Sequence, residues 1–232
     1  MAQPPSDSPL TPQRDRSSLA ITAITRPSLL ARIGFKLVRN VLIWPFFKLL
    51  FKGRVVNPER ISASKPVLVV ANHGSYLDPP LLGACLDWPV SFMAKAELFR
   101  LPLLGSIVRA LGAIPVRRGH VDRKTFSACS DQLRRGWLVA LFIEGTRSAD
   151  GRVHRPRNGA ALLAARTQLP LLPVAIVGSH RALPRGSRRP RPVPVHIRIG
   201  TALPPPVSGS KTDLDATTAA CAAAINALLD LG

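Results

Sequence analysis

Residues 138–148 read Leu-Val-Ala-Leu-Phe-Ile-Glu-Gly-Thr-Arg-Ser, an apolar run that stops abruptly at charged and small residues. A strand that is apolar at every position must be buried on both faces, as strands are in the parallel sheets of α/β proteins. Two further runs, 66–71 and 171–177, have the same character. Because segments with a helical pattern alternate with these runs, we expect an α/β fold with a mixed, mostly parallel β-sheet flanked by helices.

Apolar runs and helical patterns in the rest of the chain predict seven strands and five helices in all. The strands are expected at 54–57, 66–71, 90–94, 113–116, 138–143, 171–177 and 193–199. The helices are expected at 79–86, 103–111, 122–135, 159–167 and 213–231. With 232 residues the chain can bury one sizeable core, and we assign that domain to residues 54–232.

The residues before this domain differ in composition. Residues 1–27 are rich in Pro, Ser and Thr and have no apolar period, so we expect a disordered lead rather than a secretory signal. Residues 28–53 are mostly apolar but contain cations, which argue against a clean bilayer span, and Pro45, which predicts a kink between two helices.

Within residues 28–53, Arg32, Lys36 and Arg39 recur at helical spacing and predict a basic face. The residues expected on the opposite face are Phe35, Leu42, Trp44 and Phe46. This pattern is typical of a helix that lies in the headgroup plane of a membrane and dips into one leaflet. A core helix with solvated cations is the alternative.

The formal net charge is +19 and the pI about 11.6, with 25 arginines and 7 lysines. Such a balance predicts a polyanionic partner, either nucleic acid or an anionic membrane, although arginine-rich codon usage gives the same count without function. Aromatic residues make up only 5% and form no stacking platform, which disfavours nucleic acid. We therefore expect a peripheral or monotopic protein on the cytoplasmic face of the cell membrane, with the Pro/Arg-rich loop 181–194 near headgroups.

The three cysteines, Cys85, Cys129 and Cys221, have neither disulfide nor metal-ligand spacing. We expect buried structural thiols and no metal or cofactor.

His73 and Asp78 follow the apolar run 66–71 and carry the chemistry that we expect. A neutral imidazole can take a proton from an alcohol near pH 7, and a carboxylate on its other nitrogen fixes the tautomer and stabilises the imidazolium. The alternative is a histidine that merely closes a strand.

Two other strand ends carry polar residues, and ligands of α/β sheets bind at such ends. In the segment after 138–143, Gly145 permits a tight turn, Thr146 offers a hydroxyl, and Arg147 offers a planar fork for phosphate. The strand at 113–116 runs into Arg117 and Arg118. Surface ion pairs, with Glu144 holding one of the arginines, are the alternative.

In this order the segments resemble the sequence blocks of the glycerolipid acyltransferase family. His73 and Asp78 match the His-x4-Asp block, Arg118 ends a Gly-x-Ile-x-x-x-Arg block, and residues 142–148 resemble Phe-Pro-Glu-Gly-Thr-Arg-Ser. The blocks around Lys95 and at 172–174 are also similar. Ile143 stands where the family usually has proline, from which we expect a looser turn.

The resemblance implies the glycerol-3-phosphate acyltransferase-like fold, with residues 54–232 as the acyltransferase domain. It implies that His73, oriented by Asp78, activates the hydroxyl of 1-acylglycerol 3-phosphate (lysophosphatidic acid) for direct attack on acyl-CoA or an acyl-carrier protein, which gives phosphatidic acid for phospholipid biosynthesis. The residues that it implies for substrate binding are Lys95, Arg118, Glu144, Gly145, Thr146 and Arg147.

Two alternatives to this function stay open. The acceptor can be a lyso-ornithine lipid, glycerol 3-phosphate or another lysophospholipid, because the blocks bind what these acceptors share. The other class is a non-enzymatic basic protein that binds membranes or nucleic acid.

Overall fold

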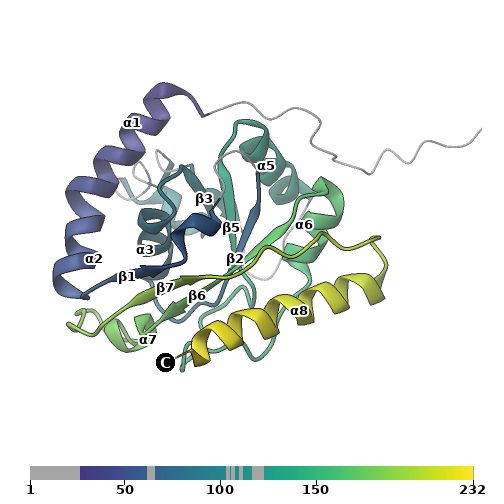
Figure 1. Ribbon diagram of the computed structural model, residues 1–232. Coiled ribbons are helices and arrows are strands. Elements are labelled where there is room, and N and C mark those ends of the chain that lie inside the picture. The colour runs from purple at the N-terminus through teal and green to yellow at the C-terminus, as the bar shows by residue number, and fades with distance from the viewer. Residues whose placement is uncertain are drawn as a thin grey trace, which may run out of the picture.

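The computed structural model describes residues 27–61, 66–102, 105, 108–109, 112–116 and 123–231. Within them, seven strands form one sheet in the order β1-β7-β6-β2-β5-β3-β4 (Figure 1). The strands are β1 (Arg54–Val56), β2 (Leu68–Ala71), β3 (Val90–Lys95), β4 (Ile114–Val116), β5 (Leu138–Phe142), β6 (Leu171–Val177) and β7 (His196–Ile199). The β6–β7 pair is antiparallel and the other pairs are parallel, so the predicted mixed, mostly parallel sheet is confirmed.

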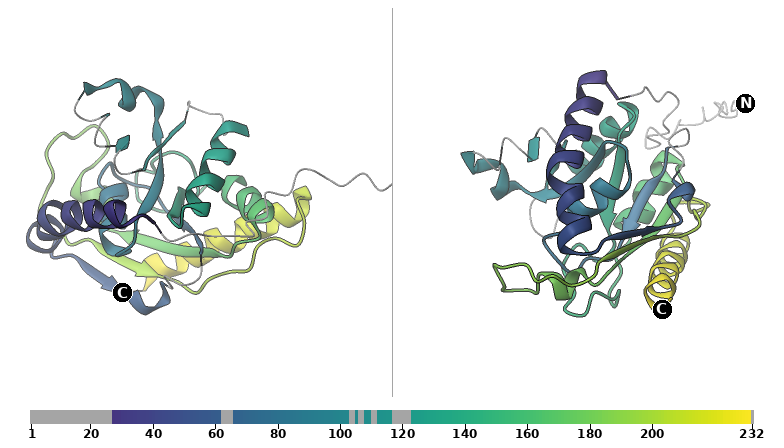
Figure 2. Two further views of the ribbon diagram at one scale, coloured as in Figure 1. Left: turned by 90° about the horizontal axis from the view of Figure 1, so that it is seen from above. Right: turned by 60° about the vertical axis from the view of Figure 1, so that its left-hand side comes forward.

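Helices cover both faces of this sheet (Figures 1 and 2). The larger helices are α1 (Leu29–Val38), α2 (Trp44–Leu50), α3 (Asp78–Cys85), α5 (Arg123–Arg134), α6 (Gly159–Thr167) and α8 (Lys211–Asp230). Alternate residues of β2 enter different cores: Val69 and Ala71 pack with α3 and the N-terminal helices, and Leu68 and Val70 pack with α5, α6 and α8. The continuous apolar strands therefore have the two-sided burial that their sequences predict.

The predicted strands are all present, with small differences at their ends. β7 begins at His196 rather than residue 193, and the two prolines just before it have no N–H for the ladder. α8 begins two residues early at Lys211, because the Ser210 side chain caps it by accepting the Asp213 N–H at 3.2 Å.

Some elements were not predicted, and some predictions cannot be compared with the structure. The short elements α7 (Ser179–Ala182), η2 (Pro58–Arg60) and η3 (Ala96–Arg100) had no periodic signal. The helix expected at 103–111 and the lead expected at 1–27 lie largely outside the described residues.

The N-terminal segment is one continuous helical run in which a π-helical turn takes the place of the expected kink. This turn, η1 (Arg39–Ile43), joins α1 to α2, and Pro45 is the second residue of α2. The Trp44 N–H donates to the Arg39 carbonyl five residues back. Because Pro45 has no N–H, the wider turn lets the run continue where a regular ladder would be interrupted.

The basic face of this run is turned differently from the prediction. The Arg39 Nε donates to the Ala84 carbonyl at the end of α3 at 2.5 Å, and the Arg32 guanidinium lies 5.6 Å from the centre of the Trp88 ring. The partly buried Phe35 and Trp44 pack against the core, so their predicted place on an outer face is wrong. Arg39 faces the protein because its guanidinium can satisfy a carbonyl at a helix end, whereas Lys36 of the same predicted face is exposed.

The outer face of the run is apolar and includes Leu42 and Phe46, the other two residues predicted to lie opposite the cations. Its exposed side chains, which we call the apolar stripe, are Leu29, Leu30, Ile33, Leu37, Val41, Leu42, Phe46 and Leu49. Between 39% and 83% of each is exposed. In the described parts of the chain, none of the helices has both the length and the apolar character needed to cross a bilayer.

All three cysteines are buried, as expected for structural thiols. Burial raises the pKa of the Cys85 and Cys129 thiols to about 12 and that of Cys221 to about 11.

Candidate active site

His73 and Asp78 lie in contact in the connection between β2 and α3. The His73 Nδ1 and the Asp78 Oδ2 are 2.8 Å apart, and the same oxygen accepts the backbone N–H groups of Gly74 and Ser75, each at 2.8 Å. Asp78 is fully buried and is the first residue of α3, where the helix dipole favours a negative charge. Since a carboxylate only accepts, this contact places the ring proton on Nδ1 and leaves the Nε2 lone pair available.

The His73 ring is held flat while one edge stays accessible. It stacks on the Phe142 ring with centroids 4.0 Å apart and an angle of 15° between the planes. The side chain is 16% exposed, and no residue in the described part of the chain hydrogen-bonds to Nε2. A substrate hydroxyl at this edge would therefore meet an oriented base.

Asn72 fixes the backbone that carries His73. Its fully buried amide group donates to the Gly151 carbonyl at 2.7 Å and to the Ile176 carbonyl at 3.0 Å, and accepts the Ile176 N–H at 2.7 Å. The Ser148 N–H donates to the His73 carbonyl at 2.8 Å. We had not assigned a role to Asn72, although an amide residue directly after a fully apolar strand is a signal of a buried hydrogen-bonding centre.

Glu144 holds a loop rather than an arginine side chain. It is 5% exposed, and its Oε1 accepts the backbone N–H groups of His154 at 3.0 Å and Arg155 at 2.7 Å. Among the described residues Glu144 forms no ion pair with a cation. The structure therefore does not support the alternative in which Glu144 pairs with an arginine side chain. Its Oε2 is buried without a partner in the same residues.

The turn after β5 is better anchored than its sequence suggests. The Ile143 N–H donates to the Ala71 carbonyl at 2.9 Å, a bond that proline could not make, and the Ile143 carbonyl accepts the Arg157 N–H at 2.8 Å. The expectation of a looser turn at Ile143 is therefore wrong. Gly145 has φ +64°, the left-handed conformation that glycine adopts freely.

Three other predicted binding residues, Lys95, Thr146 and Arg147, lie at the same edge of the sheet. Thr146 is exposed, and the Arg147 guanidinium lies 3.6 Å from the centre of the Tyr76 ring. Lys95 ends β3 in register with Val116 of β4. β2, β5, β3 and β4 are parallel neighbours, so their carboxyl ends meet at one edge, where α/β sheets bind ligands. Arg118 lies outside the described residues.

His180 packs against residues 72–78, which we call the catalytic loop, and the sequence did not predict a role for it. Burial, and next the charge of Arg181, lower its pKa below the ordinary 6.5. A Cβ added at Gly74 would lie 2.8 Å from the His180 Cβ, and one at Gly151 would lie 2.6 Å from Nδ1. Both positions therefore need glycine to let His180 pack against the loop.

Comparison with known proteins gives consistent matches. A sequence model of a family described as Acyltransferase matches residues 52–177. The 1-acyl-sn-glycerol-3-phosphate acyltransferase BAT2 of Brassica napus is 32% identical over 183 residues, which cover 77% of this chain and 51% of that protein. The lyso-ornithine lipid O-acyltransferase of Pseudomonas aeruginosa is 37% identical over 114 residues, covering 48% of this chain and 43% of that protein.

A solved structure also matches. The crystal structure of the 1-acyl-sn-glycerophosphate (LPA) acyltransferase PlsC from Thermotoga maritima superposes with a TM-score of 0.72 and 27% identity, covering 87% of this chain and 80% of that one. Against the curated plant relative, by contrast, the chain spans about half of the length.

Proposed function

This chain belongs to the acyltransferase family, and on that premise we propose that it transfers a fatty acyl group from an acyl thioester to the free hydroxyl of 1-acylglycerol 3-phosphate, forming phosphatidic acid. The observation that carries the proposal is the contact of 2.8 Å between the His73 Nδ1 and the Asp78 Oδ2, with Nε2 left open. The named relatives support the choice of acceptor.

The reaction follows from this geometry. The His73 Nε2 takes the proton of the acceptor hydroxyl as its oxygen attacks the thioester carbonyl carbon, and the Asp78 carboxylate stabilises the imidazolium that forms. The tetrahedral intermediate then collapses, the carbon–sulfur bond breaks, and the leaving thiolate takes the proton back from Nε2. No acyl-enzyme is needed, and the buried cysteines offer no nucleophile for one.

We further propose that Arg147, with Gly145, Thr146, Lys95 and Arg118, binds the phosphate of the acceptor. Arg147 lies on Tyr76, which presents its guanidinium as a rigid plane beside the catalytic loop. Glu144 would act through the loop that it holds rather than by touching the phosphate.

The test is acyl transfer in detergent with acyl-CoA or an acyl-carrier protein and lysophosphatidic acid, with the products identified by mass. His73→Ala should lower kcat by roughly 10²–10⁴, the share of a general base. If the His73→Ala variant has the same kcat as the wild type, His73 is not the general base and this mechanism is refuted.

A lyso-ornithine lipid is the second candidate acceptor, because one matching relative is named for that activity. Its hydroxyl lies on a fatty acid and it carries no phosphate, so it would not need Arg147. A panel of lysolipids at equal concentration distinguishes the two acceptors. Faster acylation of the lyso-ornithine lipid than of lysophosphatidic acid would exclude lysophosphatidic acid as the preferred acceptor.

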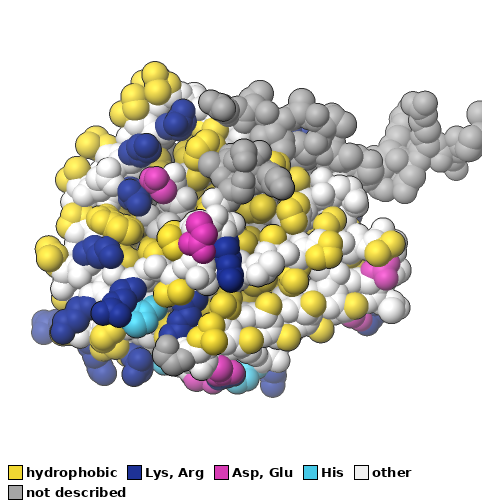
Figure 3. Space-filling model, viewed as in Figure 1, with side chains coloured by type: hydrophobic (Ala, Val, Ile, Leu, Met, Phe, Trp, Pro, Cys, Tyr) yellow, Lys and Arg dark blue, Asp and Glu magenta, His cyan; other side chains and the backbone are white. Residues whose placement is uncertain are grey.

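We also propose that the protein lies peripherally on the cytoplasmic face of an anionic membrane, with the apolar stripe in the lipid. Figure 3 shows exposed hydrophobic side chains along the edge formed by α1 and α2, and Lys and Arg side chains gathered at the end of that edge. The loop at 184–195 supplies four exposed arginines: Arg185, Arg188, Arg189 and Arg191. Backbone hydrogen bonds of Val195 with Phe51 and Arg54 join the base of this loop to the end of α2. Each cation near anionic headgroups contributes about 1 kcal/mol.

Co-sedimentation with vesicles tests the membrane proposal. Leu30 and Leu49 are each 83% exposed, so their change to Gln leaves the core intact and removes about 1.5 kcal/mol or more of lipid contact per residue. The double variant should bind anionic vesicles at least tenfold more weakly than wild type. Leu231→Gln, at an exposed position outside the stripe, is the matched control, and equal binding by all three proteins would contradict the proposal.

A further inference from the structure

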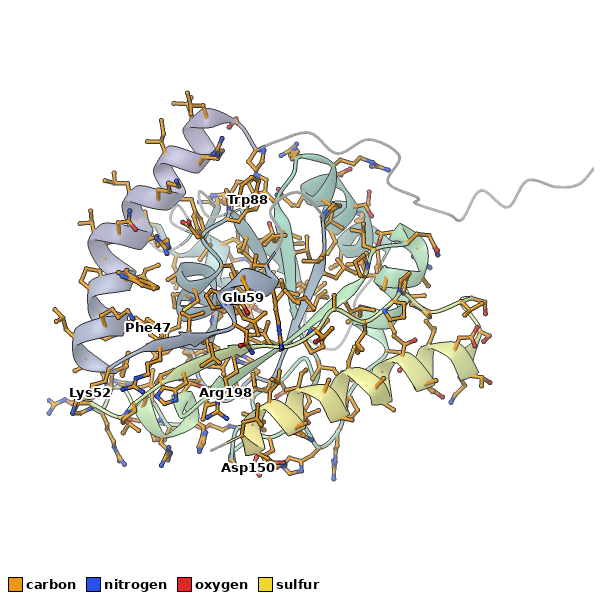
Figure 4. All side chains as sticks on the ribbon, viewed as in Figure 1. Phe47, Lys52, Glu59, Trp88, Asp150 and Arg198 are labelled. Atoms are coloured by element: carbon orange, nitrogen blue, oxygen red, sulfur yellow. The ribbon has the colours of Figure 1, made fainter. Side chains whose placement is uncertain are left out.

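The C-terminal helix α8 holds a loop that also holds the catalytic site. The Asn226 Oδ1 accepts the Val153 N–H at 3.1 Å, and the Asn226 Nδ2 donates to the Val153 carbonyl at 3.0 Å. Next to Val153, Arg152 forms two hydrogen bonds to the Asp230 carboxylate, at 2.5 and 3.1 Å. In Figure 4, Asp150 lies beside the C-terminal end of α8. We call residues 150–155 the clasp.

The other side of the clasp faces the site. The Gly151 carbonyl accepts the amide of Asn72, which directly precedes His73. The next residues on, His154 and Arg155, give their N–H groups to Glu144 at the end of β5. Among the described residues, neither Asn72 nor Glu144 hydrogen-bonds to α8 directly, and the clasp joins both of them to that helix. Asn72 has a second link, because it also bonds to Ile176 of β6, the strand on which α8 packs.

The end of α8 is a rigid base for these contacts. Ile225 and Leu228 are buried in the core under the sheet. Arg198 of β7 (labelled in Figure 4) is 6% exposed and donates to the Leu228 carbonyl at 2.7 Å. A buried cation that binds the last carbonyls of a helix fixes that end against the sheet.

We propose that Asn226 is a positioning residue of the acyl transfer: through Val153 it sets the clasp, and the clasp sets the backbone of His73 and of the Glu144 turn. The inference rests on the proposed function and extends it to α8, which lies beyond the matched residues 52–177. Asn226 is suited to this because a carboxamide pairs with both backbone groups of one residue, as a neighbouring strand would. A displacement of about 1 Å at a catalytic group can cost about 100-fold in rate.

Asn226→Ala, which removes both bonds to Val153, is the test. We expect kcat to fall 10- to 100-fold and the KM of lysophosphatidic acid to rise, because the Glu144 turn leads into Arg147, while the KM of the acyl donor stays the same. Asn226→Asp keeps the acceptor for the Val153 N–H but loses the donor, so it should recover part of the lost rate. Hydrogen exchange, which needs no activity, should accelerate in 72–78 and 144–155.

Leu214→Ala is the control, because Leu214 is buried in the first turn of α8, 12 residues before Asn226. Leu214→Ala should lower Tm by at least as much as Asn226→Ala does, but it should leave kcat and the hydrogen exchange of residues 72–78 near the wild-type values. If Asn226→Ala changes kcat no more than Leu214→Ala does, or if exchange in 72–78 does not change, the inference is overturned. Absence of acyl transfer by the wild-type protein would instead refute the proposed function, with the exchange result still deciding the inference.

Discussion

The Asp78→Asn substitution removes the negative charge next to His73 while keeping the shape of the side chain at position 78. The amide oxygen can take the place of Oδ2 and accept the same three N–H groups, so the tautomer of His73 is kept. What is lost is the negative charge that stabilises the imidazolium. Two unit charges about 4 Å apart interact by about 4 kcal/mol at an effective dielectric constant of about 20. At about 1.36 kcal/mol per factor of ten, kcat should fall about 1,000-fold.

The loss should appear in kcat rather than in either KM, because the imidazolium exists only while the reaction proceeds. Release of the thiol from the acyl donor, followed in the presence of lysophosphatidic acid, measures it. The new NH₂ would occupy the place of Oδ1, which is buried without a partner in the described residues, so Tm should also fall. Asp131→Asn is the control, since Asp131 pairs with Arg134 on the surface of α5. A loss of less than tenfold would show that His73 works without this carboxylate.

Three further changes follow from the same geometry. Arg147→Gln should raise the KM for lysophosphatidic acid at least tenfold with little change for a phosphate-free acceptor; an equal change for both in steady-state assays would refute a phosphate contact. Phe142→Leu, which removes a stacking contact worth about 1 kcal/mol, should lower kcat/KM about fivefold, and unchanged kinetics would show that the ring does not orient His73. The pKa of His180 is lowered by burial, so the unfolded chain binds more protons than the folded one as the pH falls below 6.5, and stability is lost in that range. His180→Gln should make the free energy of unfolding less dependent on pH between 7 and 5 in urea titrations, whereas an equal slope would contradict the lowered pKa.

The sequence was sufficient for the sheet and for the centre of the site, for identifiable reasons. A strand such as Leu138–Phe142 is apolar at every position, and only a doubly covered sheet buries such a strand. The contact between His73 and Asp78 could be predicted because they are only five residues apart, which is enough to connect the end of a strand to the start of a helix.

The parts that were not predicted depend on contacts between distant segments. Helical spacing placed Arg32 and Arg39 on one face but did not say that this face would meet Trp88 and the end of α3. Likewise, nothing near Asn226 in the sequence indicates Val153, 73 residues earlier. Glu144 was correctly placed at a strand end, but whether it faces a substrate or a backbone depends on how the following loop folds back.

The three buried cysteines have a consequence for an enzyme that handles thioesters. An exposed thiolate would exchange with the donor and trap the fatty acid as a dead-end S-acyl protein. Cys85, Cys129 and Cys221 are enclosed and hold their protons up to strongly alkaline pH, so the chain contains no thiolate to be acylated by its own substrate.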